Sequence, residues 1–116
     1  MKINAQEILA MRQAAGIARG DYLIDVILND LLDALVTAEA GLAGGSAKQI
    51  GKCAARVVRQ AARLQLDDLA VCAIAVGELA ERDTDPSFPA VVQRMVRCGE
   101  ASVSAVWQIL ALQVRT

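Results

Sequence analysis

Apolar residues recur at intervals of three and four along most of this chain, and no other feature restricts its fold as strongly. This period matches an α-helix that buries one face and exposes the other. In residues 21–42 the acidic side chains lie mostly opposite the apolar face. The apolar positions there are Leu23, Val26, Ile27, Leu31, Leu32, Leu35 and Val36. Only 3% of the residues are aromatic while 55% are hydrophobic, so Ala, Leu, Val and Ile must form the core, which favours closely packed helices.

Capping residues mark the expected ends of the first two helices. Asn4 followed by Glu7 forms a capping-box pattern, and the helix that it opens is expected to reach about Ala18. The following turn is expected at Gly20, because glycine commonly ends a helix. Asp21 is then expected to cap the second helix.

Turn residues divide the rest of the chain into three more helices. Ser46 follows a pair of glycines and predicts the start of a third helix that ends near Leu64. A fourth helix is expected over residues 67–82; it is apolar on nearly all sides, so we expect it to be the most buried. The loop of residues 83–87, with a proline in the turn after it, predicts a long last helix over residues 88–113.

Short connections between long amphipathic helices predict antiparallel neighbours. The sequence therefore predicts an all-α fold, with an up-down four-helix bundle over residues 21–116 and an additional short N-terminal helix over residues 1–20, laid across one end. A length of 116 residues is typical of a single domain.

Charge is nearly balanced overall but is unevenly distributed. The formal net charge of −1 argues against binding to nucleic acid or to an anionic membrane through bulk electrostatics. Residues 21–39 contain five acids and no base, whereas residues 48–63 contain five bases and no acid. Two successive expected helices therefore carry opposite charge.

The inventory of reactive residues excludes most catalytic sites. The chain contains no histidine, so it has no Ser-His-Asp or Cys-His pair, no HExxH motif and no ordinary zinc site. The acid pairs Asp67-Asp68 and Glu78/Glu81 lie at expected helix ends, where carboxylates are commonly solvated or serve as caps. We therefore expect no enzyme activity, no metal site and no cofactor.

The three cysteines are expected to be reduced thiols in the core. Cys53, Cys72 and Cys98 are widely spaced in apolar helical patterns, and no CxxC pair occurs. No secretory, lipid-anchor or membrane-spanning signal is recognisable, and acids interrupt the most apolar stretch, residues 22–42. A cytoplasmic location is expected.

The third expected helix has three distinct faces. A core stripe is formed by Ile50, Cys53, Ala54, Val57, Ala61 and Leu64. An outer stripe of bases is formed by Lys48, Lys52, Arg56, Arg59 and Arg63. Between these two lies a strip of small apolar residues, Ala55, Val58 and Ala62.

In this helix, residues 54–59 read Ala-Ala-Arg-Val-Val-Arg, and a small glycine-rich turn precedes the helix. Over about residues 21–113 the order and register of the helices resemble those of the histidine phosphotransfer (HPt) domains of two-component phosphorelays. In that family the third helix carries the motif Ala-His-x-Leu-Lys-Gly. On this resemblance, Ala55 stands in place of the phospho-accepting histidine, Val58 in place of the lysine and Arg59 in place of the glycine. No Ser, Thr, Asp or His lies between Lys48 and Leu66, so nothing there replaces the phosphoryl acceptor.

The resemblance implies a binding role without phosphotransfer. The expected partner is a response-regulator receiver domain or a histidine kinase. The phosphorylation pocket of a receiver is acidic in that family, and an arginine guanidinium suits such a pocket through charge-assisted hydrogen bonds. The residues expected to bind the partner are Lys52, Ala55, Arg56, Val58, Arg59, Ala62 and Arg63.

Two other interpretations of the same residues stay open. The bases of the third helix could be solvated or paired with the acids of the second helix. Alternatively, the chain could be a self-associating structural protein, with a homodimer seam on the small-residue strip or on the exposed part of the fourth helix. In such a dimer, the acidic helix of one copy could meet the basic helix of the other.

Overall fold

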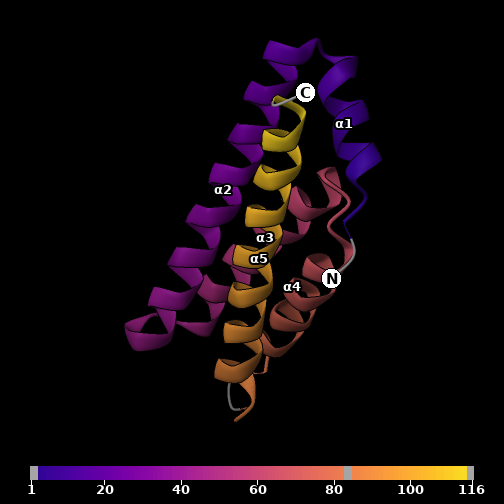
Figure 1. The fold of residues 1–116 in the computed structure, drawn as a ribbon. Coiled ribbons are helices and arrows are strands. Elements are labelled where there is room, and N and C mark those ends of the chain that lie inside the picture. Colours follow the sequence, from indigo (N-terminus) through magenta and orange to yellow (C-terminus); the bar gives the residue numbers. More distant parts are fainter. Residues whose placement is uncertain (1–2, 83–84, 115–116) are drawn as a thin grey trace.

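Residues 3–82 and 85–114 are described by a computed structural model, in which every regular element of these ranges is an α-helix (Figure 1). The helices are α1 (Ala5–Ala14), α2 (Ile17–Gly44), α3 (Ala47–Arg63), α4 (Asp67–Ala80) and α5 (Phe88–Val114). The prediction of an all-α fold is confirmed.

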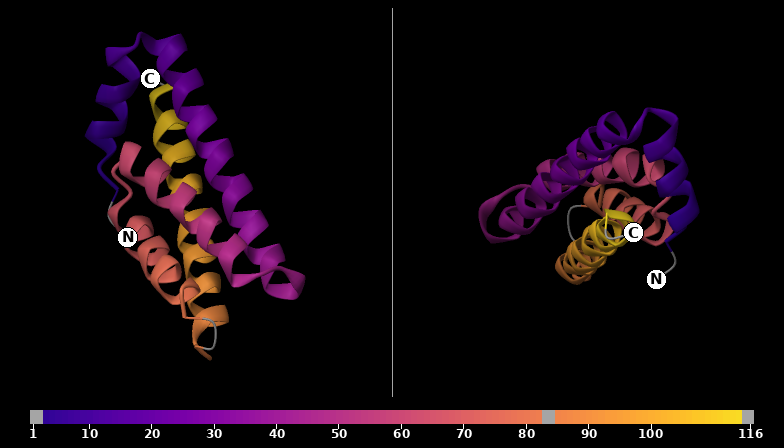
Figure 2. Two further views of the ribbon diagram at one scale, coloured as in Figure 1. Left: turned by 180° about the vertical axis from the view of Figure 1, so that it is seen from behind. Right: turned by 45° about the horizontal axis from the view of Figure 1, so that its top comes forward.

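The four longer helices lie side by side along a molecule that measures 50 × 22 × 19 Å. α3 packs against α2 and α4, and α5 packs against the same two helices. α1 packs against α2 and α5 near the end of the molecule at which α2 begins and α5 ends (Figure 2). No helix in the described part of the chain combines the length and the apolar character that crossing a membrane requires.

Two of the predicted helix caps are confirmed. The Asn4 side chain accepts a hydrogen bond from the Glu7 backbone N–H at 3.3 Å, and the Ser46 hydroxyl accepts one from the Gln49 backbone N–H at 3.2 Å. Each bond satisfies a backbone donor that the first turn of a helix leaves without a partner. The Glu7 side chain instead accepts a hydrogen bond from the Gln65 side chain, at 3.4 Å.

The predicted boundary between the first two helices is wrong. The chain turns at Gly16, which has φ +84°, and α2 begins at Ile17. Gly20 is buried inside α2, and a Cβ atom added to it would lie 2.1 Å from the Arg12 carbonyl oxygen of α1. Asp21 does not cap a helix but pairs with the Arg12 guanidinium. The sequence pattern could not distinguish a glycine that ends a helix from one that lets two helices touch.

The core is aliphatic, as predicted, and the predicted core stripe of α3 is buried along its whole length. In α2 the buried face is rotated from the predicted one, because Val26 and Val36 are exposed while Ile24 and Leu28 are fully buried. Fully buried alanines allow close contact between neighbouring helices. These alanines are Ala34, Ala38, Ala54, Ala61 and Ala73.

α4 is less buried than predicted. Val71 is 67% exposed and Ile74 is 48% exposed. Because α4 packs only against α3 and α5 among the described helices, its remaining side faces outward despite being partly apolar. The outward face of this helix is therefore available for contact with another molecule.

Replacing Gly20 with Ala should destabilise the fold. The added methyl group would collide with the backbone of α1, so α1 must move away, at a cost of about 1–3 kcal/mol. Chemical unfolding followed by circular dichroism measures this change. The control is Gly44→Ala at the end of α2, where no described atom lies within 4 Å of the new Cβ, and it should change stability by less than about 0.5 kcal/mol. Equal stability of the two variants would show that α1 does not pack on Gly20.

Candidate functional site

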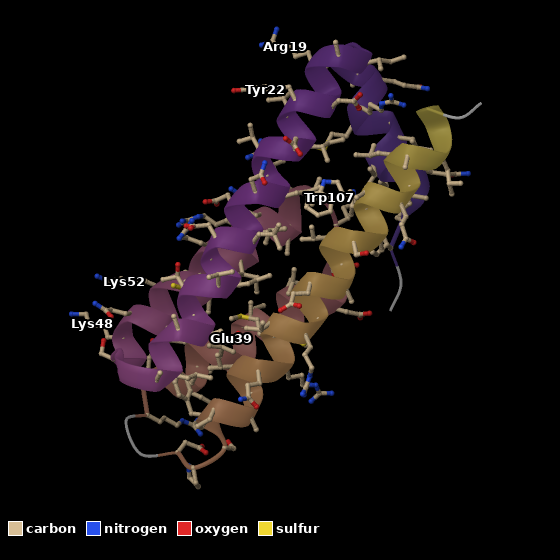
Figure 3. All side chains as sticks on the ribbon, turned by 60° about the vertical axis from the view of Figure 1, so that its left-hand side comes forward. Arg19, Tyr22, Glu39, Lys48, Lys52 and Trp107 are labelled. Atoms are coloured by element: carbon tan, nitrogen blue, oxygen red, sulfur yellow. The ribbon has the colours of Figure 1, made fainter. Side chains whose placement is uncertain are left out.

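The predicted binding residues of α3 divide into an exposed set and a half-buried set. The exposed residues are Lys52, Ala55, Arg59, Ala62 and Arg63, and their spacing places them on one side of the helix. Figure 3 shows Lys48 and Lys52 projecting outward from the first half of α3. The structure thus brings five of the seven predicted residues together on one accessible face.

Arg56 is held within the chain by the acids of α2. Its guanidinium donates to the Asp30 carboxylate and, at 3.0 Å, to the Asp33 carboxylate. The Gln60 amide also donates to Asp30, at 2.7 Å. Arg56 therefore belongs to the contact between α2 and α3. For this residue, the pairing between the acidic and the basic helix is found inside one molecule.

These contacts shift the pKa values of the charged groups. Hydrogen bonds from Gln60 and Arg56 stabilise the Asp30 carboxylate and hold its pKa below the ordinary value of 3.8. In turn, the hydrogen bonds to the Asp30 and Asp33 carboxylates stabilise the Arg56 guanidinium and raise the pKa of Arg56. Asp30 is thus ionised whenever the protein is near neutral pH.

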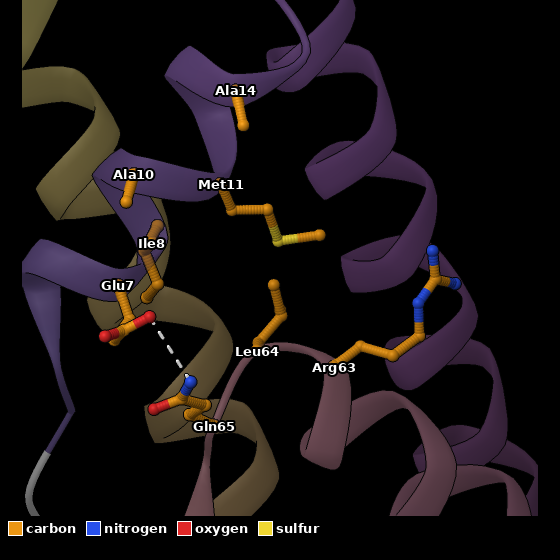
Figure 4. Close-up of a pocket in the computed structure, with 8 residues that line it drawn as sticks. All are labelled: Glu7, Ile8, Ala10, Met11, Ala14, Arg63, Leu64 and Gln65. Atoms are coloured by element: carbon orange, nitrogen blue, oxygen red, sulfur yellow. Dashed lines mark hydrogen bonds between the residues drawn. The ribbon is translucent and has the colours of Figure 1, made fainter.

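Val58, in contrast to exposed Arg63, lies apart from the exposed face. Val58 is half-buried and packs against the core. Arg63 donates to the Gln60 side chain at 3.3 Å and lines a cavity of about 450 Å³ beside α1 (Figure 4). Ile8, Met11 and Leu64 form much of the apolar lining of that cavity.

A groove of about 780 Å³ lies between α3 and α4. Its α3 side carries Lys48 and Lys52, and its α4 side carries Glu78 and Glu81. The lining between these charges is formed mainly by small or apolar residues, namely Gly51, Ala55, Ile74, Gly77 and Ala80. We refer to these nine residues as the α3–α4 groove.

Of the groove residues, only Lys52 and Ala55 are among the predicted binding residues. The sequence pattern favoured a solvated acid pair at a helix end for Glu78 and Glu81. A signal was present, since Ile74, Glu78 and Glu81 are spaced by four and three and so share one helical face. The spacing could not indicate that this face of α4 lies beside α3.

The cysteines lie in or against the core, as predicted. Cys53 is buried, and burial raises the pKa of its thiol. Burial also raises the pKa of Cys98, and the neighbouring Cys72 adds to this shift. A raised pKa lowers the thiolate fraction, which makes these thiols poor nucleophiles.

The α3–α4 groove is open, and only ammonium groups, carboxylates and small or apolar side chains line it. Such a combination of an apolar centre and a charged rim is typical of protein–protein contact surfaces. Comparison of the chain with protein families, with curated proteins and with solved structures finds no match.

Replacing Asp30 with Asn should lower the unfolding free energy at neutral pH by about 1 kcal/mol, because a partly exposed and hydrogen-bonded ion pair is lost. The folded state depresses the pKa of Asp30, so its stabilisation is complete above the ordinary value of 3.8 and is lost as the pH falls through the lower folded-state pKa. The stability difference between the wild type and the variant should shrink in that range.

Urea unfolding across a pH series measures both effects. The matched control is Asp25→Asn on the same helix, since exposed Asp25 accepts only from Asn29, at 3.3 Å, among the hydrogen bonds of the described residues. This control should cost less than about 0.5 kcal/mol. A loss as large as that of Asp30→Asn would rule out a specific role for the contact with Arg56.

Proposed function

We propose that this chain is a non-catalytic protein-interaction module of the HPt type, in which α2 to α5 form an up-down four-helix bundle and α3 carries the docking face. The neighbour relations support the bundle, because α3 and α5 each pack against both α2 and α4. The short connections between these helices are consistent with alternating directions (Figure 1).

One observation carries the proposal: Ala55 is exposed near the middle of α3, between exposed Lys52 and Arg59. Ala55 stands where the resemblance to HPt domains places the phospho-accepting histidine. The position therefore faces outward but presents a methyl group, which neither accepts a phosphoryl group nor transfers a proton. A surface that faces outward without reactive groups suits binding rather than catalysis.

The partner class follows from the charges of this face. Arg59 is exposed and forms no ion pair with the described residues, whereas Arg56 is already held by α2. We assign the contact with an acidic partner to Arg59 and Lys52, with Ala55 and Ala62 allowing close approach. A receiver domain offers an acidic pocket of the required kind, and a histidine kinase is the other candidate. This proposal places the protein in cytoplasmic signalling of the bacterial type.

Purified protein should capture a receiver domain when it is tested against the receivers and histidine kinases of its own genome. Arg59→Glu should weaken this binding by about tenfold or more, because a charge-assisted contact becomes a repulsion. Arg94→Glu, the same charge change at an exposed position of α5, should leave it unchanged. A receiver that carries a labelled phosphoryl group should keep that group in the complex and not pass it to this chain.

The proposal fails if no receiver or kinase is captured, or if the two variants reduce binding equally. Transfer of phosphate from the receiver to this chain would also contradict it, since no acceptor is assigned on α3.

A further inference from the structure

We propose that the α3–α4 groove also binds a second copy of this chain, through a two-fold axis that runs along the groove and places α3 of each copy on α4 of the other. This inference goes beyond the proposed function, because it needs no receiver and also involves Lys48, Glu78 and Glu81, which the proposed function does not use. A dimer of this form covers Lys52 and Ala55, so self-association and partner binding would compete for one face.

The two sides of the groove carry opposite charge at the same height. Gly51 lies against Ala80, since a Cβ atom on Gly51 would be 3.0 Å from the Ala80 Cβ. The first half of α3 is therefore level with the second half of α4. Lys48 and Lys52 thus lie across the groove from Glu78 and Glu81, and exposed Ile74 of α4 also lines the groove.

Symmetry then selects one way to pair two copies. An axis along the groove sets each basic side against the acidic side of the other copy, so that Lys52 faces the partner's Glu78. An axis across the groove would set α3 on α3, whose outer face is basic along its length, and like charges would repel. The groove is therefore self-complementary in the first arrangement only.

Three of the four charges lie at helix ends where their interaction with the helix dipole is unfavourable. Lys48 lies in the first turn of α3 and Glu78 in the last turn of α4, while Glu81 follows α4 directly. The helix dipole favours acids at the N-terminus and bases at the C-terminus, which is the reverse of this arrangement. No ion pair joins the two sides of the groove among the described residues, so contacts within one copy do not account for these charges.

Gly77 is a further groove residue whose identity the contacts within one copy do not explain. Glycine in a helix interior destabilises the helix relative to alanine. A Cβ atom at Gly77 would meet no described atom within 4 Å, in contrast to the close contact at Gly51. A neighbouring backbone from a second copy would account for the glycine, and exposed Val71 and Ile74 would supply apolar area around it.

Two charge-reversal variants test this interface by sedimentation at micromolar concentrations. The variant Lys48→Glu/Lys52→Glu has acidic groups on both sides of the groove, and Glu78→Lys/Glu81→Lys has basic groups on both. Each variant alone should be a monomer, because like charges face each other in the dimer, whereas the wild type should dimerise. An equimolar mixture of the two should restore a dimer with one copy of each. Both variants improve the match to the helix dipoles, so they should fold.

The reverse result on any arm overturns the proposal: a monomeric wild type, a dimer formed by either variant alone, or a mixture that stays monomeric. The charge control is Arg94→Glu/Arg97→Glu on exposed positions of α5, which should leave the dimer intact. Gly77→Leu, whose Cβ would meet no described atom within 4 Å in the monomer, should raise the dimer dissociation constant by about tenfold or more through a steric clash.

Arg59→Glu separates this inference from the proposed function. Arg59 lies outside the groove, so the variant should still dimerise while it loses the receiver. A dimer without any receiver partner would refute the proposed function alone, and receiver binding by a strictly monomeric chain would refute the dimer alone.

Discussion

Close approach of helices across small side chains is the constraint on which the rest of this structure depends. With so few aromatic residues, the chain cannot fill wide gaps between helices, so the helices must lie near one another. Gly20 meets the backbone of α1, Gly51 meets Ala80 of α4, and fully buried Ala54 and Ala61 face inward from α3. The register that these contacts impose decides which charged side chains meet, and hence what the outer face presents.

The charges of α3 show how that register acts. Arg56 lies on the side of α3 that faces α2, and there Asp30 and Asp33 hold it. Lys52 and Arg59 lie about one helical turn away on either side, but they face outward. One basic stripe in the sequence thus serves both the inner contact and the outer surface.

Much of the fold could be predicted from local patterns, because local physics produces them. The caps at Asn4 and Ser46 and the core stripe of α3 were predicted correctly, since each depends on residues within a few positions. The predictions failed at Gly20 and Asp21, whose roles depend on Arg12 of another helix. For the candidate site, the pattern placed every predicted residue on α3 and did not indicate that α4 forms the other side of the groove.

By itself, the sequence determined that the chain is helical, that Asn4 and Ser46 cap two of its helices, and that no histidine is present for phosphotransfer or ordinary zinc binding. Only the tertiary structure decided that Arg56 faces inward, that Ile74 is exposed, and that Glu78 and Glu81 lie across a groove from Lys48 and Lys52. The physical reason is that periodicity specifies the faces of each helix, whereas the choice of neighbour for each face comes from packing between residues that are distant in the chain.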